Sequence, residues 1–156
     1  MFQIQKKTSG TVPVFHLIGE IDENVNLEDL IQFSETEAIF HTKGVTRINS
    51  AGARSWIYFF ESLQKKGIHF SFTECSPAIV DQMNLIANFR AGGKVISIYV
   101  PFSCKSCKSE LFAVFPIAQL VQSQGKVPDL KCSKCGGNAH FDEIEDEYLG
   151  FLKRLK

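Results

Sequence analysis

The chain has no excess of charge of either sign and no long apolar run. Its 156 residues carry 17 basic and 17 acidic side chains, so no overall field draws it towards nucleic acid or an anionic membrane. The most apolar run, residues 111–121, is too short to cross a bilayer and contains Pro116. The first ten residues, MFQIQKKTSG, lack the apolar stretch of a secretory signal. We therefore expect a cytoplasmic protein without a membrane segment.

The sequence also lacks the usual marks of catalysis. It has no pairing of a nucleophile with a base and no glycine-rich phosphate loop. The histidines at positions 16, 41 and 69 lie on or near expected strands, where they more often pack or form hydrogen bonds than catalyse. An acidic turn at residues 20–23 can hold a cation, although a solvated turn is the simpler interpretation. We therefore expect a protein that is not an enzyme.

The first hundred residues alternate short strand-like runs with runs of helical periodicity, which is typical of an α/β fold. Strands are expected at residues 12–18, 38–40, 45–48, 69–73 and 94–100. The third strand region is expected to break at Lys43-Gly44. Helices are expected after a cap at Asn26, at residues 51–66, and from Pro77 to Gly92-Gly93. Pro101 then marks the expected edge of this unit.

The last segment, residues 142–156, is expected to form an amphipathic helix. Its acidic residues gather at the start and Lys153, Arg154 and Lys156 at the end, which matches the helix dipole. An apolar stripe of Ile144, Tyr148, Phe151 or Leu152, and Leu155 needs cover. The stripe packs either on this chain or on a partner, and a homodimer is one such arrangement.

Four of the five cysteines form two matched C-x-x-C pairs separated by 24 residues. They are Cys104, Cys107, Cys132 and Cys135. Two residues between cysteines let a tight turn aim both sulfurs at one ion, and four thiolates suit tetrahedral Zn²⁺ without an open position for water. We therefore predict one structural zinc ion in a ribbon-like β-hairpin. An iron site and a redox dithiol are the rival interpretations, but redox chemistry uses one such pair.

Other residues near the pairs are open to two interpretations. Lys105, Lys108, Lys131 and Lys134 either offset the charge of a zinc ion with four thiolates or are ordinary solvated lysines. His140 is available as a substitute ligand, but with four cysteines present it is expected to be a strand surface residue. The fifth cysteine, Cys75, is expected to be a small buried residue and not a nucleophile.

A strand-to-helix corner at V45-T-R-I-N-S-A-G52 exposes backbone amides. In the simplest interpretation Asn49 or Ser50 caps the helix, and Gly52 permits close packing. Together with the glycine-bearing strand F15-H-L-I-G-E-I-D22, this corner resembles the STAS domain of bacterial anti-sigma factor antagonists. The resemblance covers residues 1–100, and the segment 101–141 looks like an appended zinc ribbon that precedes the helix at 142–156.

This resemblance implies a mixed sheet with helices packed on it and a role in regulation through protein binding. The corner in that family reads Asp-Ser-Ser-Gly or Asp-Ser-Thr-Gly, and a partner kinase that is itself an anti-sigma factor phosphorylates the second hydroxyl. Here Asn49 replaces the acid and Ala51 replaces that hydroxyl, so only Ser50 keeps a hydroxyl, one position early. Alanine cannot accept phosphate.

We expect a partner-binding surface formed by Asn49, Ser50, Ala51, Gly52 and Arg54, without the usual phospho-switch. The expected partner is another cytoplasmic regulatory protein, an anti-sigma factor or a kinase-like protein. The alternative is nucleic-acid binding by the ribbon, as in transcription-associated proteins. Composition disfavours it, because acidic residues flank the lysines and no aromatic residues alternate with them.

Overall fold

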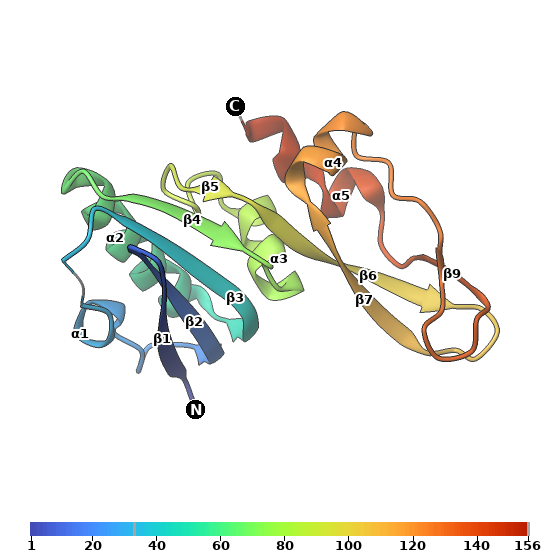
Figure 1. Ribbon diagram of the computed structural model, residues 1–156, viewed down its shortest axis with the longest axis horizontal. Coiled ribbons are helices and arrows are strands. Elements are labelled where there is room, and N and C mark those ends of the chain that lie inside the picture. Colours follow the sequence, from blue (N-terminus) through green and yellow to red (C-terminus); the bar gives the residue numbers. More distant parts are fainter. Residues whose placement is uncertain (33, 156) are drawn as a thin grey trace.

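A computed structural model describes residues 1–32 and 34–155 of the chain. Lys156, which the sequence placed at the end of the last helix, lies outside this part. Two sheets make up the fold, one from strands between residues 3 and 95 and one from strands between residues 97 and 141 (Figure 1). None of the helices in the described part is long and apolar enough to span a membrane.

The strands are β1 (Gln3–Ser9), β2 (Val12–Ile21), β3 (Glu37–Ile48), β4 (His69–Thr73), β5 (Lys94–Val95), β6 (Ser97–Cys104), β7 (Glu110–Pro116), β8 (Leu130–Lys131) and β9 (Asn138–Phe141). The helices are α1 (Leu27–Leu30), α2 (Ser50–Lys65), α3 (Pro77–Leu85), α4 (Ile117–Gln122), α5 (Glu145–Tyr148) and the 3₁₀ helix η1 (Gly150–Arg154).

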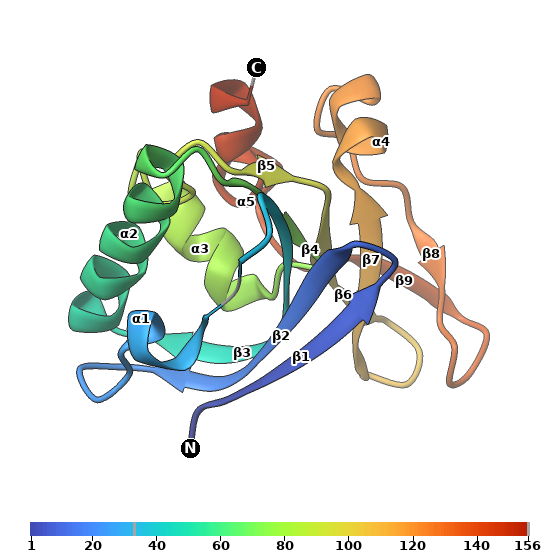
Figure 2. The ribbon, with the colours of Figure 1, turned by 60° about the vertical axis from the view of Figure 1, so that its left-hand side comes forward.

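The first sheet is mixed and has the strand order β1-β2-β3-β4-β5. Its first two strands form an antiparallel hairpin, and every later pair is parallel. Parallel neighbours need a crossover, and the three crossovers contain α1, α2 and α3 in turn. The two longer helices are α2 and α3. Both helices lie on the same face of the sheet (Figure 2), so β2, β3 and β4 alternate buried and partly exposed residues. The expected α/β fold with helices packed on a mixed sheet is confirmed.

Aromatic side chains fill the space between this sheet and α2. Trp56 of α2 is fully buried and stacks on Phe89, with ring centroids 5.0 Å apart. Its indole Nε1 donates to the Phe89 carbonyl oxygen at 3.0 Å, so the polar atom of the ring keeps a partner inside the core. Phe60 and Phe72 pack on Trp56, and Phe40 packs on both of them. This core holds α2 against the strands.

The third strand does not break at Lys43-Gly44 as expected, because β3 runs unbroken from residue 37 to 48. Gly44 serves a different purpose. A Cβ there would lie 2.9 Å from the side chain of Ile18 and 3.0 Å from the carbonyl oxygen of Leu17. The β2–β3 pairing also shifts register next to this position. The glycine therefore allows β3 to approach β2 closely.

The predicted bounds of two elements near the junction of the sheets were wrong. The helix that begins at Pro77 ends at Leu85, before Gly92-Gly93, because Phe89 must turn inward to stack on Trp56. The strand expected at 94–100 is two strands, β5 in the first sheet and β6 in the second. Between them the Ile96 amide donates to the Phe72 carbonyl, while the Ile96 carbonyl accepts from Ile117. One residue thus hydrogen-bonds to both units.

The second sheet is antiparallel, with the order β7-β6-β9-β8, and is larger than the expected hairpin. The buried face of β6 and β7 includes Val100, Phe102 and Phe115. β6 continues through Pro101 as far as Cys104, so the expected unit boundary at residue 100 falls inside a strand. The partition into 1–100, 101–141 and 142–156 stays a prediction.

The C-terminal segment packs on this chain but is not one helix. It consists of α5 and η1, separated at Leu149. The Asn84 side chain explains the break, because its amide donates to the Tyr148 carbonyl at 2.8 Å and its oxygen accepts from the Phe151 amide at 2.8 Å. These are groups that a continuous helix would pair internally. Tyr148 and Phe151 are buried, whereas Ile144 is 61% exposed.

Candidate metal centre

The sulfurs of the four paired cysteines converge. The two turns that carry them, after β6 and before β9, lie at the end of the second sheet farthest from the first (Figure 1). Cys104 ends β6 and Cys107 lies in the turn that follows, while Cys132 and Cys135 lie in the turn between β8 and β9. Antiparallel pairing of β6 with β9 aligns Cys104 with Ala139 and so brings the two turns together. The fold thus unites ligands separated by 24 residues of sequence.

The sulfur positions fit one tetrahedral ion. All four Sγ atoms lie within 4.8 Å of one another. The Cys104–Cys135 and Cys107–Cys132 sulfurs are 3.5 and 3.7 Å apart. A tetrahedral zinc ion with bonds of about 2.3 Å places its sulfurs about 3.8 Å apart. All five cysteines are free thiols, so the four paired ones are available as ligands.

Backbone amides point at the sulfurs and stabilise thiolate. The Lys134 amide donates to Sγ of Cys132 and the Gly137 amide to Sγ of Cys135, each at 3.4 Å. A Cβ on Gly137 would lie 2.6 Å from Oγ of Ser106 and 3.3 Å from the Cys135 sulfur. Glycine is therefore needed where the second turn faces the first.

The opposite pKa shifts of Cys107 and Cys135 reflect competition for charge between neighbouring sulfurs. The Ser109 hydroxyl and amide lower the pKa of Cys107 to about 6. The Gly137 amide favours the Cys135 thiolate, but competition from neighbouring sulfurs and desolvation outweigh it and raise the pKa of Cys135 to about 11. Four thiolates this close require a cation to coexist. Cys104 and Cys132 are buried, which also favours a structural ion over an exchangeable one.

The nearby lysines, His140 and the fifth cysteine, Cys75, all lie outside the ligand set. Lys105, Lys108, Lys131 and Lys134 are all exposed around the cysteine turns, and the ion pairs found in residues 1–32 and 34–155 involve none of them. His140 lies on β9 and pairs with Asp129 at 3.0 Å, so it is a strand residue outside the ligand set, as expected. Cys75 is fully buried, and desolvation raises its pKa to about 12, as expected for an inert thiol.

The strand-to-helix corner is built on Asn49, which is the N-cap of α2. Its Oδ1 accepts from the Gly52 amide at 2.8 Å, and its Nδ2 donates to Glu23 Oε2 at 2.9 Å. The second bond needs an amide, because an aspartate has no donor. It also lowers the pKa of Glu23. Asn49 therefore both caps α2 and holds Glu23. Ser50, the other residue expected as a possible cap, is instead the exposed first residue of the helix.

Removal of the Asn49 side-chain oxygen is expected to destabilise α2. Asn49→Ala leaves the Gly52 amide without its partner and should lower the free energy of unfolding by about 1 kcal/mol. Asn49→Ser keeps a capping oxygen and should recover most of that loss, although it cannot bond to Glu23. Urea unfolding followed by circular dichroism measures both. Equal losses in the two variants would contradict the capping role.

Gly52 anchors the same corner to the sheet. A Cβ at this position would overlap the carbonyl oxygen of Ile21 and lie 2.7 Å from its carbonyl carbon. The Asn49 amide also donates to the Ile21 carbonyl at 3.2 Å. The start of α2 is therefore fixed against the end of β2, as expected for a glycine that permits close packing. Arg54, one turn later, is exposed.

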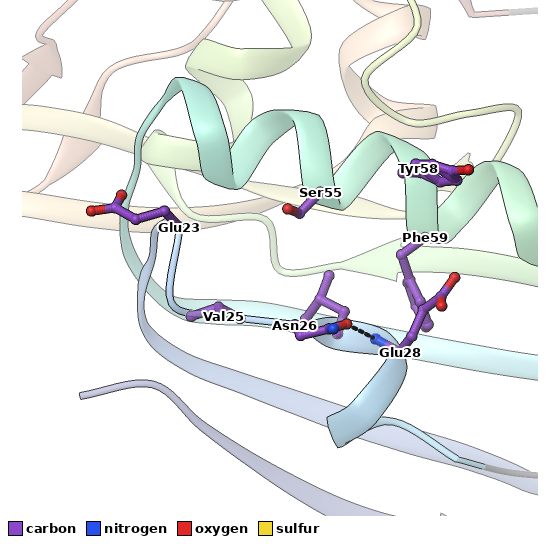
Figure 3. A pocket seen from close by; sticks show the side chains of 8 residues that line it. Glu23, Val25, Asn26, Glu28, Ser55, Tyr58 and Phe59 are labelled. Atoms are coloured by element: carbon purple, nitrogen blue, oxygen red, sulfur yellow. Dashed lines mark hydrogen bonds between the residues drawn. The ribbon is translucent and has the colours of Figure 1, made fainter.

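The acidic turn at residues 20–23 does not gather its carboxylates. Asp22 accepts from the Asn24 amide and Glu23 is held by Asn49, and the cysteine cluster is the only group with metal-binding geometry in the described part of the chain. Glu23 instead borders a groove of about 390 Å³ between α1 and α2. Figure 3 shows Val25 and Asn26 below this groove and Ser55, Tyr58 and Phe59 of α2 above it.

A polar cluster that the sequence did not indicate lies where the two sheets meet. Glu74 accepts from His41 at 2.8 Å and from the Tyr99 hydroxyl at 2.9 Å. The His16 ring lies 4.4 Å from that of His41. Glu74 has a φ of +47°, an uncommon conformation for this residue. These four residues are far apart in sequence, and the arrangement of strands β2, β3 and β6 brings them together. No short sequence motif therefore contains the cluster.

The Glu74 cluster is expected to make stability depend on pH. Burial raises the pKa of Glu74, but the hydrogen bonds from Tyr99 and His41 and the charges of His41 and Lys43 together lower it below its ordinary 4.5. The charged form thus stabilises the fold above about pH 4.5, and this contribution is lost as the pH falls through the lowered value. Glu74→Gln should unfold at lower urea than wild type at pH 7.

That difference should shrink as the pH falls below 4.5. The exposed Glu37 at the start of β3 is the matched control, and Glu37→Gln should follow the wild-type curve. Urea midpoints at pH 7, 5 and 3.5 give the comparison. A Glu74→Gln deficit of constant size across this range would contradict the assignment.

No protein-family model matches the chain, and the search of curated proteins finds no match either.

Proposed function

We propose that the chain is a non-enzymatic regulatory module that binds another cytoplasmic protein at the start of α2. The supporting observation is a groove of about 560 Å³ at the corner, lined by residues of β3, α2 and α3. Ala53, Ile57 and Ile86 give it an apolar floor, and Arg54 is its one charged lining residue. Leu85 at its edge is 76% exposed. An exposed apolar site beside one cation suits a partner segment with apolar residues and an acid.

The resemblance to STAS domains supports the same surface. An antiparallel hairpin followed by parallel strands, with α2 beginning directly after β3, agrees with the order of elements on which the resemblance rests. A rigid corner is also what a docking site needs, because preformed geometry lowers the entropic cost of binding. Asn49 and Gly52 supply that rigidity.

The proposed module works without the usual phospho-switch. Ala51 has no hydroxyl, and Asn49 is committed to Gly52 and Glu23. Ser50 is exposed at the first turn of α2, so phosphate on its hydroxyl is the one remaining route to a charge switch here. We favour constitutive binding. The structural zinc ion then stabilises the second sheet, which adds surface to the module. The ion takes no part in chemistry, because four thiolates leave it no open coordination position.

Affinity purification from native cells, with quantitative mass spectrometry, tests this function. Arg54→Glu combined with Ser50→Glu should remove the proteins that wild type enriches, because two acids would face the acidic segment of the partner. Lys65→Glu, a charge reversal at the other end of α2, is the control and should retain them. If the double variant retains every partner of the wild type, the surface lies elsewhere. The same spectra report phosphate on Ser50.

The second candidate is nucleic-acid binding by the cysteine turns. Four exposed lysines around those turns favour it. Neither of the two ion pairs found in residues 1–32 and 34–155 involves any of these lysines. Phosphate contacts by four lysines would make binding fall steeply with salt. An electrophoretic mobility shift of DNA or RNA that weakens strongly between 50 and 200 mM salt would favour this candidate. Lys105→Gln with Lys134→Gln should then reduce the salt dependence.

A further inference from the structure

A second hollow lies at the junction of the two sheets, away from both the cysteines and the corner. Its volume is about 410 Å³, within the range of small-molecule sites. β3, the start of α3, and strands β6 and β7 all contribute to its walls, and these elements meet near the centre of the molecule (Figure 1). The lining includes Lys43, Pro77, Ala78, Tyr99 and Phe112.

The walls of this hollow are mainly apolar and aromatic. Pro77 and Ala78 provide aliphatic surface, and the rings of Tyr99 and Phe112 come from adjacent strands of the second sheet. Phe112 is 54% exposed, a large fraction for a phenylalanine that borders a concave surface. Two rings and a proline offer flat faces on which an aromatic group can stack.

One charge faces the hollow. Lys43 is the only lining residue with a formal charge, and its Nζ lies 5.7 Å from the centroid of the Tyr99 ring. Both carboxylate oxygens of the nearby Glu74 already accept hydrogen bonds, one from His41 and one from Tyr99. α3 also begins at this wall, so the positive end of its dipole adds to the Lys43 charge.

The Glu74 cluster holds one wall in place in advance. Tyr99 is fixed through its hydroxyl, and the Glu74 amide donates to Ser97 Oγ at 2.8 Å. Ser97 Oγ in turn lies 3.1 Å from Thr73 Oγ1. The strained backbone at Glu74 is thus stabilised by several bonds that together orient the ring. A wall that needs no rearrangement favours binding of a small ligand.

We propose that this hollow binds a small aromatic monoanion, a flat ring system that carries one carboxylate or sulfonate. The ring system lies between Phe112 and Tyr99, and the acidic group faces Lys43. This site is separate from the corner groove, because the hollow uses the start of α3 at Pro77 and Ala78, whereas the groove uses its end at Gln82 and Leu85.

Two fluorescent probes with the same rings test the site in the zinc-loaded chain of 156 residues. 1-Anilinonaphthalene-8-sulfonate carries the anionic group, and N-phenyl-1-naphthylamine lacks it. We expect saturable binding of one sulfonate probe per chain and weaker binding of the neutral one. Phe112→Ser should weaken binding of the sulfonate probe about tenfold. Lys43→Gln should abolish the preference for the anion.

Matched controls distinguish binding at this site from nonspecific hydrophobic binding of the probe. Val114 lies on the same strand, is 42% exposed and does not line the hollow, so Val114→Ser should change affinity by no more than about twofold. Lys94 is an exposed lysine of β5 that does not line the hollow, so Lys94→Gln should keep the preference for the anion. Binding without saturation, or equal losses in Phe112→Ser and Val114→Ser, would overturn the proposal.

Amide chemical shifts in the unaltered protein provide a readout that needs no variant to fold. Addition of the sulfonate probe should move the signals of Val45, Ala78 and Tyr99. Shifts confined to Ile57 and Leu85 would place the probe in the corner groove and overturn the assignment.

Discussion

Replacement of Cys132 with serine is expected to release the metal and unfold the outer part of the second sheet. Its β8 has two residues and β9 four, and the turns at the cysteines have little apolar contact of their own. A unit this small needs a metal to compensate for its small core. Loss of a structural metal is among the few single changes that cost about 4 kcal/mol or more.

Thermal unfolding and amide hydrogen exchange measure this effect. The midpoint should fall by about 10 °C or more, and protection should be lost first at β8 and β9. Trp56 fluorescence should keep its buried character well below the new midpoint, because the aromatic core of the first sheet lies elsewhere. Cys75→Ala is the control, since it removes a buried thiol outside the cluster and should keep the metal. Unchanged protection at β9 in Cys132→Ser would contradict a structural role.

Gly52→Ala is expected to have the second-largest effect. The added Cβ would overlap the Ile21 carbonyl oxygen, and a backbone atom cannot rotate away as a side chain can. Either α2 shifts from the end of β2 or the strand bends. We expect a loss of about 2–3 kcal/mol in the free energy of unfolding. Because the corner carries the proposed partner surface, binding should weaken as well.

Gly150→Ala is the matched substitution for this test. The nearest atom to a Cβ at Gly150 is Asn84 Oδ1 at 3.6 Å, an ordinary contact. Its unfolding midpoint in urea should stay close to that of the wild type. If Gly52→Ala is no less stable than Gly150→Ala, the close approach of α2 to β2 is not a constraint on the fold.

Local patterns predicted the elements whose causes are local. The spacing of the four cysteines identified the cluster, because a C-x-x-C turn fixes the geometry of each pair by itself. The helix after the corner was correct within one residue at either end, since its apolar stripe, Asn49 and Gly67 are all close in sequence.

The misjudged elements depend on contacts that are distant in sequence. Gly44 looked like a strand break, but its role is set by Ile18 on the neighbouring strand. The last helix has good periodicity, yet Asn84 interrupts it from more than sixty residues away. Ile96 joins two sheets through partners on β4 and at the start of α4. A periodic pattern carries no signal for such partners.

The same distinction applies to the sites. The corner residues adjoin in sequence and were found together, although only the structure shows that Asn49 needs its amide to reach Glu23. The Glu74 cluster and the hollow beside Phe112 draw on β3, α3, β6 and β7. No local sequence pattern marks any of their residues as functional. The arrangement of the strands in the two sheets brings these residues together.

Metal content is the most direct test of the central claim, that the four cysteines form one closed metal site. Protein purified under reducing conditions without added metal should contain one zinc ion per chain by mass spectrometry of the native protein and by elemental analysis. Cys104→Ser and Cys135→Ser should each lose it, whereas His140→Ala should keep it. A wild-type chain that carries no metal, or a zinc ion that survives in both cysteine variants, would contradict the account.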